Sequence, residues 1–165
     1  MLVCGIPNVG KSAILNRMIG EKRLKEGNKP GVTRGLSWVR LTPYLELMDS
    51  PGMLWPKIED EKAGAAIALL GSVRQEILDE EQLAFYLVDM LREAEPELLM
   101  DRYGLEELAA DAWEVLGQIC RRRGFLIRGG EYDYERGAKT LLEEFRNGKL
   151  GRFSLQAPPN QAKAE

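Results

Sequence analysis

Histidine is absent from this chain of 165 residues, and Cys4 and Cys120 are its only cysteines. The chain therefore lacks the commonest general base and metal ligand. The two cysteines share no metal-binding spacing, and both lie in apolar patterns, so we expect reduced core side chains and no zinc site. No apolar run is long enough for a membrane span, and the first predicted strand begins too early for a signal peptide. We therefore expect a cytoplasmic location.

Charge is distributed unevenly along the chain, although its net value is only −3. Residues 1–53 carry 8 Lys and Arg against 4 Asp and Glu, whereas residues 54–165 carry 15 against 22. An acidic protein does not coat nucleic acid by charge alone, but local basic patches can still contact phosphates. The hydrophobic fraction of 44% is ordinary for a folded domain and excludes a fully disordered chain.

A phosphate-binding loop is the clearest motif in the chain. Residues 5–12 read Gly-Ile-Pro-Asn-Val-Gly-Lys-Ser, which matches G-x-x-x-x-G-K-[ST] between an apolar run and a helical pattern. The glycines permit a tight turn of inward-facing N–H groups, and the helix dipole favours an anion at the same point. A chance glycine turn is the alternative, but the flanking strand and helix favour phosphate binding. The predicted nucleotide-binding residues of the loop and the following helix are Asn8, Val9, Gly10, Lys11, Ser12 and Ala13, and Gly52 further along the chain is predicted to join them.

Three side chains complete the predicted chemistry of a Mg²⁺ nucleotide site. Lys11 would reach the β- and γ-phosphate oxygens, and the Ser12 hydroxyl would bind Mg²⁺. The polar segment 21–35 contains Thr33, which is the best candidate to complete the metal shell and sense the γ-phosphate, although it could be a simple turn residue.

A second signature follows the predicted hairpin of strands 36–41 and 44–48. Asp49-Ser50-Pro51-Gly52 is a D-x-x-G sequence at the end of a strand, about forty residues after the lysine. Asp49 can hold Mg²⁺ through water, and the Gly52 N–H can contact the γ-phosphate. The first helix should span 11–19, with Ile14, Leu15 and Met18 facing the sheet.

These motifs together resemble the ribosome biogenesis GTPase A family. The resemblance is carried by the loop at 5–12, by Pro-Gly-Val-Thr at 30–33 and by residues 49–57, which read Asp-Ser-Pro-Gly-Met-Leu-Trp-Pro-Lys. It continues through Arg-Tyr-Gly-Leu at 102–105 and Arg-Gly-Gly at 128–130, to about residue 153. It implies GTP and GDP as ligands, Mg²⁺ as cofactor, and the large ribosomal subunit with its rRNA as partner.

Members of this family are circularly permuted, with the guanine-reading N-K-x-D element ahead of the phosphate loop. Asn28-Lys29-Pro30-Gly31 begins like this element but ends in glycine, and no other N-K-x-D occurs. The chain therefore looks like a C-terminal part of such a GTPase or a shortened relative, and we expect weak discrimination between GTP and ATP. Met53 stands where related GTPases carry a water-orienting glutamine. By resemblance, Asn8 is a K⁺ ligand.

The remainder of the chain has helical patterns. We expect helices over 63–70, 81–94, 105–123 and 134–147, with a short one opened by Pro96. Their apolar stripes predict the core of a helical bundle. Two basic clusters are candidate RNA contacts, although they could also be solvated helix ends. Their members are Arg121, Arg122, Arg123 and Arg128 in the first, and Lys149 and Arg152 in the second.

We therefore expect an α/β fold in which a partial P-loop GTPase sheet is followed by an all-α helical bundle. The predicted boundaries are 1–58 for the GTPase portion, 59–155 for the helical domain and 156–165 for a disordered tail. GTP hydrolysis as a switch in assembly of the large ribosomal subunit is the expected function. Two alternatives stay open: an ATPase, and a ribosome- or rRNA-docking helical module whose phosphate loop has low base specificity.

Overall fold

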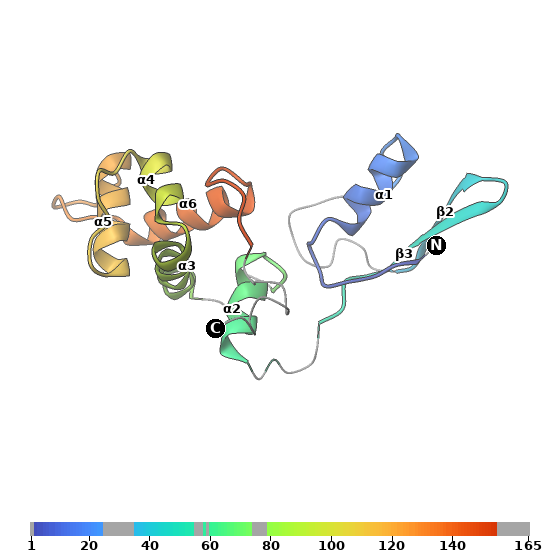
Figure 1. Ribbon diagram of the computed structural model, residues 1–165, viewed down its shortest axis with the longest axis horizontal. Coiled ribbons are helices and arrows are strands. Elements are labelled where there is room, and N and C mark those ends of the chain that lie inside the picture. Colours follow the sequence, from blue (N-terminus) through green and yellow to red (C-terminus); the bar gives the residue numbers. More distant parts are fainter. Residues whose placement is uncertain (1, 25–34, 55–57, 59, 74–78, 155–165) are drawn as a thin grey trace, which may run out of the picture. The chain divides into compact units, whose positions relative to one another are not determined.

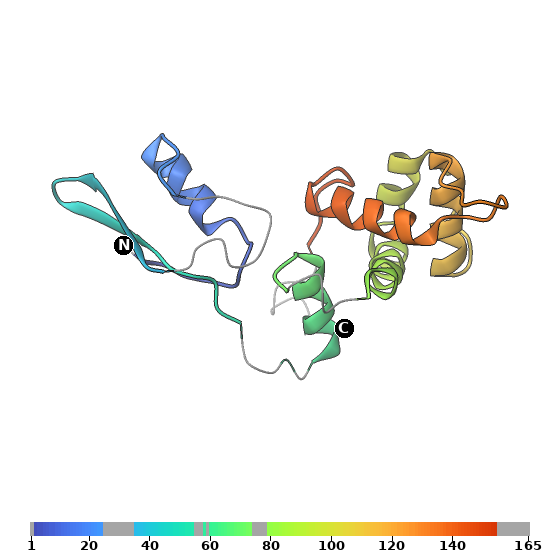
Figure 2. The same cartoon turned by 180° about the vertical axis from the view of Figure 1, so that it is seen from behind.

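The computed structural model describes residues 2–24, 35–54, 58, 60–73 and 79–154. The chain divides into two compact units, residues 1–78 and 79–165. Figures 1 and 2 show the elements of both units from opposite sides. The boundary expected after residue 58 stays a prediction, and helix α2 (Glu61–Leu69) groups with the first unit. The expected tail lies outside the described residues.

The first unit contains a sheet in the order β1-β3-β2, formed by Leu2–Val3, Leu45–Asp49 and Ser37–Thr42. The predicted hairpin is confirmed, because β2 and β3 pair antiparallel, with Trp38 opposite Met48. Strand β1 pairs with β3 in parallel, with Val3 opposite Asp49. Parallel strands end at the same edge of a sheet, so the loop after β1 and the D-x-x-G segment after β3 lie together.

Helix α1 spans Lys11–Ile19 and ends at Gly20, as predicted. Its expected apolar face is wrong in part, since Leu15 is fully buried but Ile14 and Met18 are exposed. The buried neighbour is Asn16, whose amide accepts hydrogen bonds from the Leu24 and Arg23 N–H groups and donates one to the Leu24 carbonyl. A polar side chain can replace an apolar one in a buried position when it is satisfied in this way.

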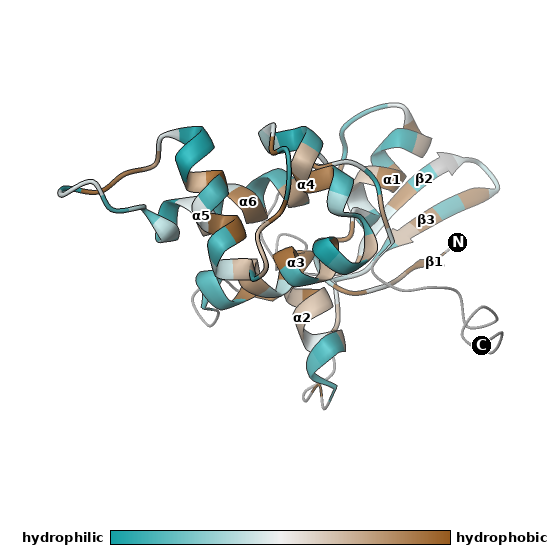
Figure 3. Cartoon of the chain, turned by 60° about the vertical axis from the view of Figure 1, so that its left-hand side comes forward, coloured by the Kyte–Doolittle hydropathy of each residue, from teal (hydrophilic) through white to brown (hydrophobic). Residues whose placement is uncertain are grey.

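The described part of the second unit, residues 79–154, contains four helices: α3 (Glu80–Ala94), α4 (Pro96–Tyr103), α5 (Ala112–Arg123) and α6 (Tyr134–Arg146). Asp79, Asp111 and Asp133 cap the N-termini of α3, α5 and α6 by accepting backbone N–H groups. Apolar and polar residues alternate around these helices, as amphipathic helices require (Figure 3). The expected sheet followed by a helical bundle is confirmed.

Helix α5 begins seven residues later than the predicted residue 105. Gly104 adopts a left-handed conformation (φ 64°) that ends α4, and the Asp111 side chain then starts the next helix. The segment between them is held by Gln118, which accepts from the Ala109 N–H at 3.2 Å and donates to the Glu107 carbonyl at 3.2 Å. The predicted first turns of this helix are therefore absent, and residues 105–111 form a segment held by Gln118 that leads to the Asp111 cap.

The core of the second unit is built where α3, α5 and α6 meet. Its fully buried side chains include Leu87, Val88, Leu91, Leu116, Ile119 and Leu141. Gly137 of α6 packs against the sulfur of Cys120, where a Cβ atom would overlap it. Burial raises the pKa of the Cys120 thiol to about 11, so this cysteine is protonated and inert. Cys4 was also expected in the core, but it is exposed.

Candidate nucleotide site

The phosphate loop joins β1 to α1 and contains three residues with positive φ, which are Gly5, Asn8 and Gly10. Gly10 has φ 86°, a left-handed conformation directly before the first turn of α1. Asn8 has φ 60°, which is unusual for a residue other than glycine. Gly52 lies so close to the Pro7 backbone that a Cβ atom would overlap it, and the Met53 N–H donates to the Gly5 carbonyl at 3.2 Å. The D-x-x-G segment is therefore packed directly on the phosphate loop.

Lys11 is folded back over the loop to which it belongs. Its ammonium group donates to the Ile6 carbonyl at 2.8 Å. The next residue, Ser12, donates its hydroxyl to Asp49 Oδ2 at 2.6 Å across 37 positions of sequence. The structure thus brings together the lysine, the serine and the aspartate that the sequence assigned to one site.

The Asp49 carboxylate is the most informative group of this site. Its residue is only 1% exposed, and among the described residues its Oδ1 atom is buried without a hydrogen-bond partner. An orphaned carboxylate oxygen is costly unless a further ligand satisfies it. Serine and carboxylate oxygens are the donors that Mg²⁺ prefers. The residues present therefore fit a magnesium site.

The other residues predicted for this site lie outside the described part of the chain or at its surface. Thr33 and the segment Asn28-Lys29-Pro30-Gly31 lie outside the described residues, so the role of Thr33 stays a prediction. Met53, which stands where related GTPases carry a water-orienting glutamine, is exposed. Val9 and Ala13 are also exposed, and they lie in the loop and in the first turn of α1.

Two residues after helix α2 contact the phosphate loop and were missed by the sequence analysis. The Ser72 hydroxyl donates to the Pro7 carbonyl at 2.5 Å, and Asn8 Nδ2 donates to the Gly71 carbonyl at 3.3 Å. A signal for this turn existed, because Gly71 directly follows an apolar helical stretch and glycine commonly ends a helix. Nothing in the sequence indicated its long-range partners.

The basic residues of the second unit lie on both sides of α6 in the sequence, with Arg128 before the helix and Lys149 and Arg152 after it. The two clusters approach each other at Glu144 in the last turn of α6, which accepts from the Arg123 side chain at 2.8 Å and, through its carbonyl, from the Lys149 N–H at 2.9 Å. Arg121, Arg122, Arg128, Lys149 and Arg152 are exposed. Within the described ranges, Arg121, Arg122 and Arg128 form no ion pair.

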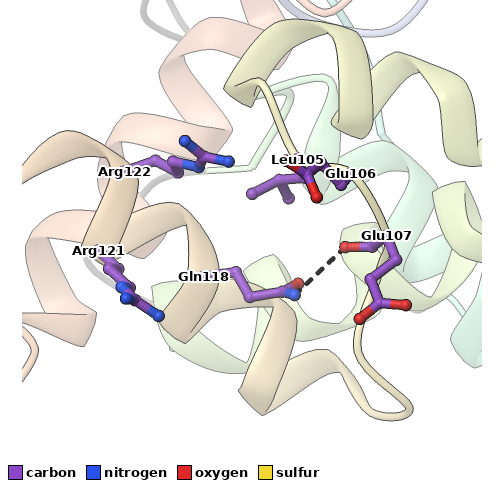
Figure 4. A pocket seen from close by; sticks show the side chains of 6 residues that line it. All are labelled: Leu105, Glu106, Glu107, Gln118, Arg121 and Arg122. Atoms are coloured by element: carbon purple, nitrogen blue, oxygen red, sulfur yellow. Dashed lines mark hydrogen bonds between the residues drawn. The ribbon is translucent and has the colours of Figure 1, made fainter.

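Arg121 and Arg122 line one side of a cavity of about 580 Å³. Across from them lie Glu106 and Glu107, with Gln118 between the two sides (Figure 4). The lining therefore has both signs of charge, unlike a simple phosphate-binding patch.

Arg123 belongs to a buried ionic cluster that the sequence analysis missed. Glu144 of α6 is 7% exposed and accepts two bonds from Arg102 of α4, at 2.6 and 2.9 Å. Arg123 of α5 donates to it at 2.8 Å, and Tyr103 at 3.0 Å. The hydrogen bonds from Arg102 hold the pKa of Glu144 below its usual value despite its burial. Burial raises the pKa of the Tyr103 hydroxyl, which therefore stays a donor.

The parallel β1–β3 pair, the loop between β1 and α1, and the Ser12–Asp49 contact define a phosphate-loop nucleotide-binding protein. The family model described as 50S ribosome-binding GTPase matches residues 1–117, and the chain belongs to this family. The resemblance seen in the sequence is thereby confirmed.

Relatives named ribosome biogenesis GTPase A include those of Priestia megaterium and Thermotoga maritima. The first is 41% identical over 157 residues, which are 95% of this chain and 54% of the relative. The second is 31% identical, with 96% of this chain and 56% of the relative covered. The chain thus spans little more than half the length of these relatives.

Solved structures of YlqF have a similar fold. A GDP-bound structure matches with a TM-score of 0.63 and 28% identity over 95% of this chain and 60% of that one. The GNP-bound structure from T. maritima matches with a TM-score of 0.60 and 28% identity over 96% and 59% of the two chains. No helix in the described part of the present chain is long and apolar enough to cross a membrane.

Proposed function

We propose that the first unit binds GTP and GDP with Mg²⁺, and that the protein hydrolyses GTP as a cytoplasmic switch in assembly of the large ribosomal subunit. The observation that carries this proposal is the Ser12–Asp49 contact of 2.6 Å beside the phosphate loop, with its unsatisfied buried oxygen. The names of the relatives support guanine and the ribosome as partners.

Each residue of the proposed site would contact a different part of the Mg²⁺-nucleotide. Lys11 would leave the Ile6 carbonyl and bind the β- and γ-phosphate oxygens as a point charge. Ser12 and Thr33 would bind Mg²⁺ directly and Asp49 through water, while the Gly52 N–H would contact the γ-phosphate. Bound Mg²⁺ neutralises charge that develops on the phosphate oxygens.

GTP hydrolysis requires a group that orients the attacking water and a positive charge that stabilises the transition state. Met53 replaces the water-orienting glutamine, and the sequence has no histidine to substitute for it. We propose that a K⁺ ion bound near Asn8 supplies part of the charge stabilisation.

The alternative function is a helical module that docks on rRNA and whose nucleotide site has low base specificity. It is favoured by one observation, the absence of an N-K-x-D sequence from this chain. A site that hydrogen-bonds a base can reject the wrong one by about 10⁴-fold, and without such a site ATP and GTP should compete nearly equally. Competition between the two nucleotides measures this base specificity, and GTP hydrolysis by the chain, or its absence, distinguishes the two functions.

Association with the large subunit is expected to depend on the basic clusters of the second unit. Reversing one charge in each, in the Arg122→Glu/Lys149→Glu double variant, should weaken cosedimentation with large subunits by about tenfold or more and reduce its salt dependence. The matched control is Lys139→Glu, a reversal at an exposed position of α6 outside both clusters. Association of the double variant equal to that of the control would remove the RNA assignment.

A further inference from the structure

Helix α2 ends in a glycine turn that faces the phosphate loop. Gly71 adopts φ 69°, and the Gly71 and Ser72 N–H groups donate to the Ala68 and Ile67 carbonyls at 2.9 and 3.1 Å. This is a Schellman motif, which fixes the last turn of a helix by satisfying its free carbonyls. The turn therefore has a defined conformation with Ser72 directly after it.

This turn makes two contacts with the centre of the phosphate loop. Ser72 is 1% exposed and donates its hydroxyl to the Pro7 carbonyl at 2.5 Å. In the opposite direction, Asn8 Nδ2 donates to the Gly71 carbonyl at 3.3 Å. Two adjacent residues of the loop are thus bonded to two adjacent residues of the turn, more than sixty positions away in sequence.

Pro7 is held by a second neighbour as well. Gly52 packs against the Pro7 backbone with no room for a Cβ atom, while Ser72 binds the Pro7 carbonyl. The loop also has to keep Asn8 at φ 60°, a conformation that residues other than glycine rarely adopt. Strained backbone of this kind persists only where the surroundings fix it.

We propose that Ser72 and Gly71 are positioning residues for the phosphate loop, which hold Pro7 and Asn8 in the conformation that receives the phosphates. The inference rests on the proposed nucleotide site and adds to it an element that no motif contains. The hydrogen bond from Asn8 Nδ2 to the Gly71 carbonyl restricts the orientation of the Asn8 amide.

The Ser72→Ala variant tests this directly with a fluorescent GDP analogue and Mg²⁺. Loss of one buried hydrogen bond should weaken nucleotide affinity by about tenfold. The matched control is Ser154→Ala, an exposed serine in the second unit, which should bind like the wild type. Circular dichroism verifies that each variant is folded. Affinity of a folded Ser72→Ala variant within about twofold of the wild type would overturn the proposal.

Hydrogen exchange of the unsubstituted chain gives a second test that needs no variant. Addition of Mg²⁺ and GDP should slow amide exchange in residues 67–73 together with residues 5–12, because the turn and the loop are bonded to each other. Protection of 5–12 without any change at 67–73 would overturn the positioning role but leave the nucleotide site intact. Absence of protection in both segments would contradict the proposed nucleotide binding itself.

Discussion

The Lys11→Ala variant is expected to bind Mg²⁺-nucleotide at least about a hundredfold more weakly than the wild type, which corresponds to about 3 kcal/mol. The ammonium group of Lys11 lies over the phosphate loop, 2.8 Å from the Ile6 carbonyl. A neutral carbonyl is a weaker partner than a phosphate oxygen, so the lysine should transfer to the nucleotide when it binds. The alanine variant removes this charge-assisted contact.

The measurement is a titration with a fluorescent GDP analogue in the presence of Mg²⁺. Lys139→Ala is the matched control, since Lys139 is an exposed lysine of α6 in the second unit. It should leave the affinity unchanged, because Lys139 is not part of the phosphate loop. The match is close, since the net charge of the chain changes equally in both variants. Affinity of Lys11→Ala close to that of Lys139→Ala would mean that the loop does not bind phosphate through this lysine.

The second large effect is expected at Glu144, in the ionic cluster that joins α4, α5 and α6. Replacing it by glutamine keeps its volume but removes the charge that Arg102 and Arg123 share. Removal of one partner of a fully buried pair costs about 3–5 kcal/mol. The side chains of Arg102 and Arg123 are 31% and 34% exposed and can be partly solvated. We therefore expect a loss of about 2–3 kcal/mol in the free energy of unfolding of the second unit.

The loss should depend on pH in a defined direction. The pKa of Glu144 is lower in the folded protein than its ordinary value of 4.5, so the folded state binds this proton less readily than the unfolded state. The stabilisation is fully present above the unfolded pKa and disappears as the pH falls through the folded one. The difference between wild type and Glu144→Gln should therefore be largest near neutral pH and shrink below about pH 4.5.

Urea unfolding followed by far-ultraviolet circular dichroism at several pH values measures this difference. Glu143→Gln is the control, because Glu143 is the exposed neighbour on the same helix. It should change the free energy of unfolding by less than about 0.5 kcal/mol. Equal stabilities of the two variants at neutral pH would show that the cluster does not stabilise the bundle.

Local signals in the sequence were enough to predict much of the fold and the site. The phosphate loop has a fixed spacing of glycines, lysine and serine, and D-x-x-G follows a strand. Lys11, Ser12 and Asp49 could therefore be assigned to one site from the sequence alone. Helix α1 ends at its glycine, and α6 spans Tyr134–Arg146, close to the predicted 134–147. Each of these features depends on residues close together in the chain or on a known motif.

The missed features depend on partners that are distant in sequence. Glu144 looks like an ordinary exposed residue of an amphipathic helix until Arg102 and Arg123 are placed beside it, 42 and 21 positions away. Arg123, predicted as an RNA contact, is engaged in this cluster. Ser72 likewise gains its partner Pro7 from 65 positions away. Periodicity reports which face of a helix is apolar but not which polar residue finds a buried partner.

The most direct test of the account is calorimetric titration of this chain with a non-hydrolysable GTP analogue, with and without Mg²⁺. The orphaned Oδ1 atom of Asp49 and its contact with Ser12 predict one bound nucleotide, with affinity at least about tenfold higher when Mg²⁺ is present. In Asp49→Asn that Mg²⁺ dependence should be lost. Binding that is absent, or that is equally tight with and without Mg²⁺ in the wild type, would contradict a magnesium nucleotide site built on Ser12 and Asp49.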